Sequence, residues 1–223
     1  MTYVLLILGV LLSFAFVYFM RPTNNGDLKL LLAFSGAFLL SLTIFELFPS
    51  VYAISDSKTI GVYIMLGMLL QVFLEFFSKG AEHGHMHLDV EKANFPWLLF
   101  VSLSIHSLLE GFPIKTHDHL IYGILIHKIP IAMVLGIFLL NSKIKIIHAV
   151  LFMVLFSLMT PFGNYMAVHF DFATKYYAPI TALVIGVFLH ISTIILFESS
   201  EGHKFNLRKL VVIILGIIIA YSL

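Results

Sequence analysis

Long apolar stretches recur along the whole chain, and they constrain its fold more than any other feature. A helix that crosses the hydrocarbon core of a bilayer needs roughly 20 mostly apolar residues. Eight stretches approach or exceed this length, at about 3–20, 29–50, 60–78, 95–113, 120–140, 145–167, 177–198 and 207–222. The sequence therefore predicts an all-α membrane protein, with eight transmembrane helices in a single domain that covers residues 1–223.

Composition supports a membrane environment and excludes several other classes. Hydrophobic residues make up 60% of the chain and charged residues only 11%, whereas soluble domains are typically about a quarter charged. A net charge of +1 without a basic run disfavours a nucleic-acid partner. The absence of cysteine excludes a disulfide scaffold and thiolate metal sites. The lipid bilayer is the expected surrounding.

The distribution of Lys and Arg predicts how the spans are oriented. Eight spans place four connections on one side of the membrane, at 21–28, 79–94, 141–144 and 199–206. These connections and their flanks hold nine Lys and Arg residues, against three on the opposite side. Since positive residues are enriched in cytoplasmic loops, both termini are expected outside and the 79–94 loop in the cytoplasm. The compact loops favour a prokaryotic inner membrane.

Ionisable side chains within the expected spans are the strongest functional signal, because charges inside a membrane are costly. His106 and Glu110 are four residues apart in the fourth span, so their side chains share one helical face. His127 lies in the fifth span at a similar depth, since both histidines are seven or eight residues from the short connection between these spans. Two imidazoles and one carboxylate form a ligand set suited to zinc or a similar divalent cation.

Two simpler interpretations of these residues stay open. A buried histidine commonly makes a hydrogen bond between helices. Glu110 and Lys128, a cation inside the fifth span, can also neutralise each other as a packing salt bridge.

The expected cytoplasmic loop at 79–94 carries a second group of histidines. His83, His85 and His87 alternate along it, with acidic residues nearby. Such a segment is typical of a weak, exchangeable metal-capture site. The alternative is a solvated loop with incidental histidines.

The chain resembles the ZIP family of divalent-metal transporters in its layout and in four motifs. The family's fourth- and fifth-span motifs are matched by His106-Ser107-x-x-Glu110-Gly111 and by His127-Lys128-x-Pro130, and weaker matches are Glu46-x-x-Pro49 and Gly186-Val-Phe-Leu-His190. The resemblance implies inverted pseudo-repeats of spans 1–3 and 6–8 around a central pair, 4 and 5, which suits rocking of one bundle against another. It also implies a transporter and not an enzyme.

The same resemblance implies a function and a site. Zn²⁺, or Fe²⁺, Mn²⁺ or Cd²⁺, would move into the cytoplasm as substrate, with no prosthetic group, and Glu46 and His190 would line the pathway. A homodimer is compatible with this class. Many family members carry a second metal site, but the corresponding positions here are Ser107, Lys128 and Ile131. An ammonium beside Glu110 repels a second cation, so a mononuclear site is expected.

Two other classes of membrane protein are alternatives to a transporter. A membrane metal sensor or scaffold that does not transport would also explain the missing second-site ligands. An intramembrane metalloprotease is disfavoured because the chain contains no His-Glu-x-x-His run.

Overall fold

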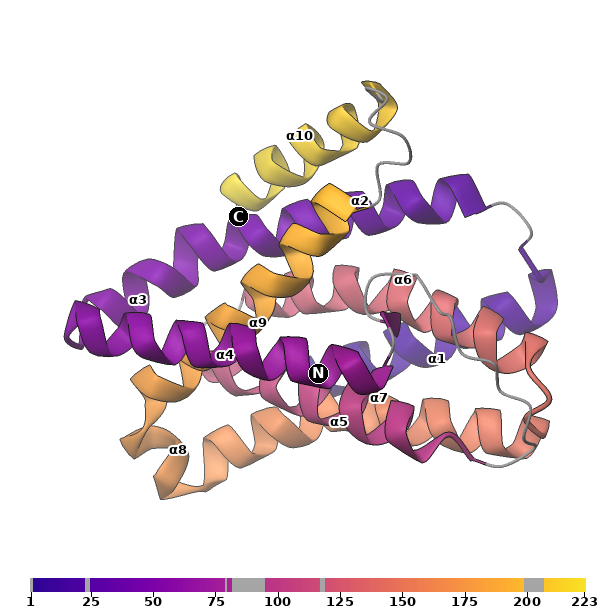
Figure 1. The fold of residues 1–223 in the computed structure, drawn as a ribbon, viewed down its shortest axis with the longest axis horizontal. Helices are drawn as coiled ribbons and strands as arrows, with labels where there is room; N and C mark the ends of the chain where they lie inside the picture. The colour runs from indigo at the N-terminus through magenta and orange to yellow at the C-terminus, as the bar shows by residue number, and fades with distance from the viewer. Residues whose placement is uncertain (1, 23–24, 79, 82–94, 117–118, 199–206) are drawn as a thin grey trace.

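The protein folds as a bundle of long helices (Figure 1). The computed structural model describes residues 2–22, 25–78, 80–81, 95–116, 119–198 and 207–223, and none of these residues lies in a β-strand. The elements in chain order are α1 (Thr2–Met20), α2 (Asn25–Leu42), the π-helix η1 (Thr43–Leu47), α3 (Phe48–Tyr52), α4 (Ser57–Ser78), α5 (Trp97–Glu110), the 3₁₀-helix η3 (Phe112–Lys115), α6 (Leu120–Asn141), α7 (Ile146–His169), α8 (Asp171–Lys175), α9 (Tyr177–Glu198) and α10 (Leu207–Tyr221).

Seven helical segments of the described chain are long and apolar enough to cross a membrane. One of them combines α2, η1 and α3, and another combines α5 and η3. The predicted all-α membrane protein is therefore confirmed. The eighth predicted span corresponds to α10, which has 15 residues. At 1.5 Å per residue this helix is about 22 Å long, shorter than a hydrocarbon core of about 30 Å, so the eighth span stays a prediction.

Local capping explains where α4 begins. The Oδ2 atom of Asp56 accepts hydrogen bonds from the backbone N–H of Thr59 at 2.9 Å and from its hydroxyl at 3.0 Å. An aspartate in this position satisfies an N–H group that has no partner within the helix. These hydrogen bonds hold the pKa of the exposed Asp56 carboxyl below its ordinary value, since they favour the ionised form.

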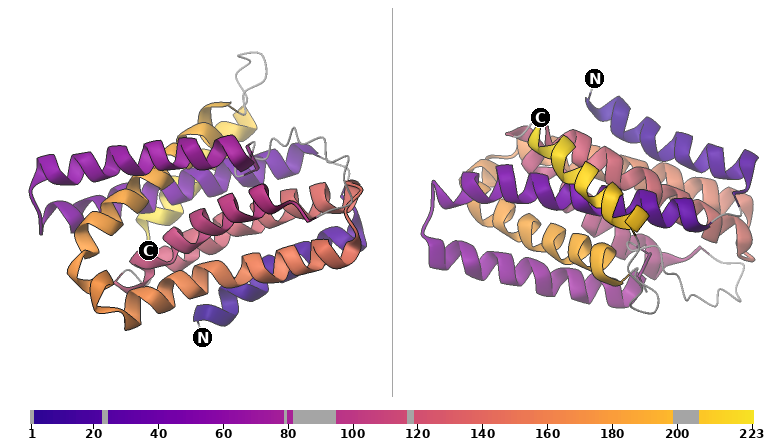
Figure 2. Two further views of the ribbon diagram at one scale, coloured as in Figure 1. Left: turned by 60° about the horizontal axis from the view of Figure 1, so that its bottom comes forward. Right: turned by 90° about the horizontal axis from the view of Figure 1, so that it is seen from above.

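The long helices pack in two groups. In one group, α4 packs against α9, and α2 packs against both α9 and α10; in the other, α1 packs against α6 and α7, and α5 packs against α7. Figure 2 shows α10 lying across α2 at one edge of the bundle. The groups meet where α2 contacts α6 and where α4 contacts α5. The bundle therefore consists of two helix groups, and we call the interface between them the seam.

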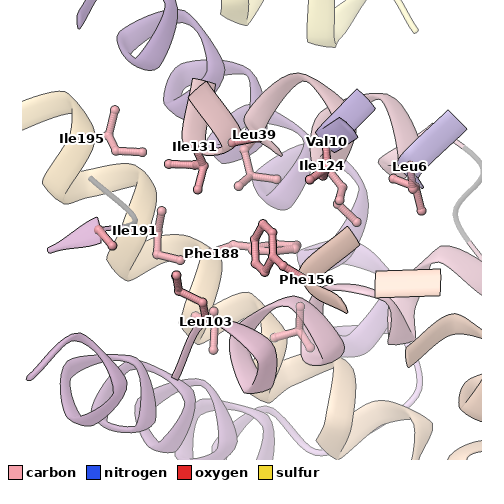
Figure 3. Close-up of a cluster of buried hydrophobic side chains, with 14 of the residues drawn as sticks. Leu6, Val10, Leu39, Leu103, Ile124, Ile131, Phe156, Phe188, Ile191 and Ile195 are labelled. Atoms are coloured by element: carbon pink, nitrogen blue, oxygen red, sulfur yellow. The ribbon is translucent and has the colours of Figure 1, made fainter. Parts of the chain in front are cut away.

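Large apolar side chains from both groups fill this seam (Figure 3). Leu39 and Phe188 come from α2 and α9, whereas Leu103, Ile124 and Phe156 come from α5, α6 and α7. All five are at most 1% exposed. Since close-packed side chains hold their neighbours in place, the core positions α5 and α6 for the polar residues described below.

Two glycine pairs bring helix backbones together within each group. A Cβ atom on Gly67 or Gly186 would overlap backbone atoms across the α4–α9 contact. The same is true of Gly111 and Gly163 across the contact between the α5–η3 span and α7. Backbones this close leave no room for side chains, so these contacts depend on glycine.

The substitution Gly186→Ala is expected to destabilise the protein, because the new Cβ would overlap the carbonyl oxygen of Ile64 in α4. Overpacking of this kind costs about 1–3 kcal/mol. Gly61→Ala is the matched control in α4, since its Cβ would have no atom of another described residue near it within 4 Å. Thermal unfolding in detergent would measure both. Equal melting temperatures for Gly186→Ala and wild type would show that the α4–α9 contact is looser than described.

Candidate metal centre

Three potential ligands meet between α5 and α6. His106 and Glu110 lie one turn apart on α5, and His127 projects from α6. One ligand atom from each of the three residues lies within 4.8 Å of the others. All three residues are at most 3% exposed. The helical spacing and the depth argument thus predicted which residues come together.

The two carboxylate oxygens of Glu110 face different neighbours. Oε1 lies 2.7 Å from Nε2 of His106, but Oε1 makes no properly aligned hydrogen bond with any described residue. Oε2 lies 2.9 Å from Nζ of Lys128 and accepts a 3.4 Å hydrogen bond from the hydroxyl of Thr160. One oxygen is therefore directed to the histidine side, and the other is engaged by a cation.

Lys128, on α6, is held by groups from α5 and α7. Besides the Glu110 contact, its Nζ donates a 2.8 Å hydrogen bond to Oγ of Ser107 and lies 4.6 Å from the ring centroid of Phe156. The lysine is 3% exposed. A buried ammonium needs such compensation, because desolvation of an unpaired charge is costly. The position of Lys128 beside Glu110 agrees with two interpretations. The pair can be a packing salt bridge, or the ammonium can occupy the place of a second metal ion.

Sequence reasoning did not identify the contribution of α7. Thr160, which is fully buried, donates a 2.9 Å hydrogen bond to the carbonyl oxygen of Ser107 in addition to its contact with Glu110. Phe156 is 1% exposed and supplies the ring beside Lys128. One threonine and one phenylalanine within an apolar span are common, so neither gave a signal. The close α5–α7 contact is what brings them to the site.

The other predicted residues lie away from this cluster or outside the described chain. His190 on α9 contacts Glu75 on α4, with Nε2 and Oε2 2.7 Å apart. Glu75 was not among the residues predicted to form a site. Glu46 lies half-buried in the π-helix η1 and does not belong to the three-residue cluster. The histidines at 83, 85 and 87 lie outside the described residues.

The fold and the site together define a class of protein. Membrane-length helices surround a buried group of two imidazoles and a carboxylate. Ionisable side chains inside a membrane-spanning protein are costly, so they are usually paired with polar groups or serve a function. The class is an integral membrane protein with a candidate centre for a divalent cation.

Two curated proteins are similar to part of the chain. Protein zntD of Dictyostelium discoideum is 30% identical over 162 residues, which cover 62% of this chain and 24% of zntD. Zinc transporter ZIP1 of Danio rerio is 33% identical over 93 residues, which cover 38% of this chain and 30% of that protein. The chain thus spans less than a third of the length of each relative, and no protein-family model matches it. The similarities support the ZIP family membership that the motifs predict.

Proposed function

We propose that this protein transports zinc, or a similar divalent cation, into the cytoplasm through a mononuclear site formed by His106, Glu110 and His127. The observation that carries the proposal is the convergence of their ligand atoms within 4.8 Å in the buried interior. Zinc binds imidazole nitrogen and carboxylate oxygen readily. The similarity to a zebrafish zinc transporter supports the choice of cation.

The charges at the site favour the binding of a single divalent cation with an affinity low enough for release. The Lys128 ammonium already engages one oxygen of Glu110 at 2.9 Å, so an incoming cation would be ligated by the other oxygen and by the imidazoles. Since the ammonium and carboxylate charges cancel, the site attracts a cation less strongly than two free carboxylates would. Moderate attraction suits a transporter, which must release what it binds.

The helix contacts support the inverted repeat and the eighth span. If α1, α2 and α4 correspond to α7, α9 and α10, and α5 corresponds to α6, the contact of α4 with α9 is equivalent to that of α10 with α2. The contact of α1 with α6 is likewise equivalent to that of α7 with α5. All four contacts are present. The two helix groups would then be the bodies that rock against each other.

The positions of Glu75, His190 and Glu46 support a path toward the cytoplasm. The Glu75–His190 pair lies near the end of α4 that leads to the 79–94 loop, and its side chains are 26% and 14% exposed. It would receive the cation from the central site and pass it to His83, His85 and His87. Glu46, near the opposite end of its span, would act at entry. The direction, the outward termini, the prokaryotic membrane and a homodimer stay predictions.

A membrane metal sensor or scaffold is the second candidate. Lys128 favours it, because a salt-bridged Glu110 also suits a site that binds metal without moving it. Metal flux separates the two functions, since a sensor binds but does not carry.

Zinc uptake into proteoliposomes tests transport directly. We expect saturable uptake by the wild type and a loss of at least about tenfold with His106→Ala. Mutating a residue that only supports a metal ligand commonly costs 10–100-fold in affinity or activity, and this substitution removes a ligand itself. His169→Ala is the matched control, since this exposed histidine lies at the end of α7, outside the cluster. Binding without uptake by the wild type would instead support the sensor.

A further inference from the structure

A buried amide on α4 has no hydrogen-bond partner in the described part of the chain. Gln71 is 0% exposed, and neither its Nε2 nor its Oε1 atom makes a hydrogen bond with any described residue. Leaving a buried donor or acceptor unsatisfied costs about 1–3 kcal/mol. An apolar side chain of similar size would avoid that cost. A group of this kind calls for an explanation beyond packing.

Two contacts bracket the position of Gln71 on its helix. Four residues before it, Gly67 lies against the backbone of Leu183 on α9. Three residues after it, the carbonyl oxygen of Leu74 accepts a 2.6 Å hydrogen bond from Ser102 on α5. Residues three and four apart share one face of a helix. The amide is therefore buried where α4 meets both α5 and α9.

The same contacts give its depth in the membrane. The spans α4 and α5 are consecutive and run in opposite directions. From the Leu74–Ser102 contact, one turn back along α4 leads to Gln71, and one turn forward along α5 leads to His106. Gln71 thus lies at about the depth of the central site. One turn onward along α4, Glu75 contacts His190.

We propose that Gln71 is a transient ligand for the transported cation between the central site and the Glu75–His190 pair. The proposal rests on the proposed transport function. Its amide oxygen would replace part of the hydration shell that a cation cannot keep among buried apolar side chains. Because an amide is neutral, it binds a divalent cation more weakly than a carboxylate does and allows rapid release.

The substitution Gln71→Leu tests this role by separating transport from stability. We expect the maximal rate of zinc uptake in proteoliposomes to fall at least about tenfold, because the barrier to leaving the central site rises. Equilibrium zinc binding by the purified protein should change by less than about threefold. The melting temperature should stay the same or rise, since two unsatisfied polar atoms are removed. Gln71→Asn, which keeps a shorter amide, should transport at an intermediate rate.

Ser192→Ala is the matched control. Ser192 on α9 is also fully buried, and its Oγ has no hydrogen-bond partner among the described residues. It lies two residues from His190 and so points to a different side of the helix. Its uptake should equal that of the wild type.

Three outcomes would overturn the inference. Wild-type uptake by Gln71→Leu, with uptake still lost in His106→Ala, would remove Gln71 from the pathway and leave the proposed function intact. A lower melting temperature together with weaker zinc binding would show that Gln71 is structural, for instance through a bound water. No uptake by the wild type would reject transport itself, and the role of Gln71 with it.

Discussion

Replacing Glu110 by glutamine is expected to abolish saturable metal uptake and to destabilise the protein at the same time. The carboxylate is the only acidic member of the three-residue cluster, and an amide supplies no charge to a divalent cation. We expect zinc binding to weaken at least about 100-fold, which corresponds to roughly 2.7 kcal/mol. Isothermal titration of purified protein and uptake into proteoliposomes would measure binding and transport.

The loss of stability has a separate cause. Glu110→Gln leaves the ammonium of Lys128 buried without a counter-charge, beside the hydroxyl of Ser107 and the ring of Phe156. Breaking a buried ion pair from one side costs about 3–5 kcal/mol. Glu110→Gln combined with Lys128→Met removes both charges, so its melting temperature should recover most of the loss.

That double variant separates folding from function. It should be stable and correctly inserted, yet still fail to take up zinc, because the anionic ligand is absent. Zinc uptake at the wild-type rate by a stable double variant would exclude Glu110 as a ligand and leave the salt bridge as its role.

The sequence predicted those parts of the fold that depend on length and local spacing. Seven apolar stretches recur as helices of membrane length, because the bilayer thickness fixes their length. The π-helix Thr43–Leu47 gave no such signal, and α2 begins at Asn25, before its apolar stretch. Polar residues at the edge of a membrane can continue a helix, so hydropathy alone does not locate the ends.

Some residues of the site could also be predicted from local spacing, whereas others could not. His106, Glu110 and His127 were predictable because a four-residue spacing and a common depth can be counted along the chain. Thr160 and Gln71 were not, because the buried side of a mostly apolar helix is decided by which neighbours it meets. Those neighbours are set by contacts such as that of Gly163 with the backbone of Leu108, which connect distant parts of the sequence.

Replacing Lys128 by aspartate is expected to convert a one-metal site into a two-metal site. In the wild type, Nζ of Lys128 lies 2.9 Å from Oε2 of Glu110 and 2.8 Å from Oγ of Ser107. Aspartate is shorter and leaves space there, and a cation with metal–oxygen distances of about 2.0–2.2 Å can bridge two carboxylates. Metal analysis of the purified protein should therefore change from one zinc per chain to two.

The same variant should depend on metal for its stability. Without a cation, Lys128→Asp places two carboxylates in a buried site with no ammonium to balance them, so the free protein should unfold at a lower temperature than the wild type. Added zinc should raise that temperature more than it does for the wild type, because ligands stabilise the state that binds them. Lys128→Met is the control, since it removes the ammonium without adding a ligand and should still bind one zinc.

The stoichiometry decides what the lysine does. Two zinc ions in Lys128→Asp and one in Lys128→Met would mean that the ammonium occupies the place of a second cation, held there by Glu110 and Ser107. One zinc in both variants, with equal thermal shifts on adding metal, would contradict that role. Lys128 would then serve to neutralise Glu110 within the core, and the mononuclear site would have to follow from the packing of α5, α6 and α7 around the three ligands.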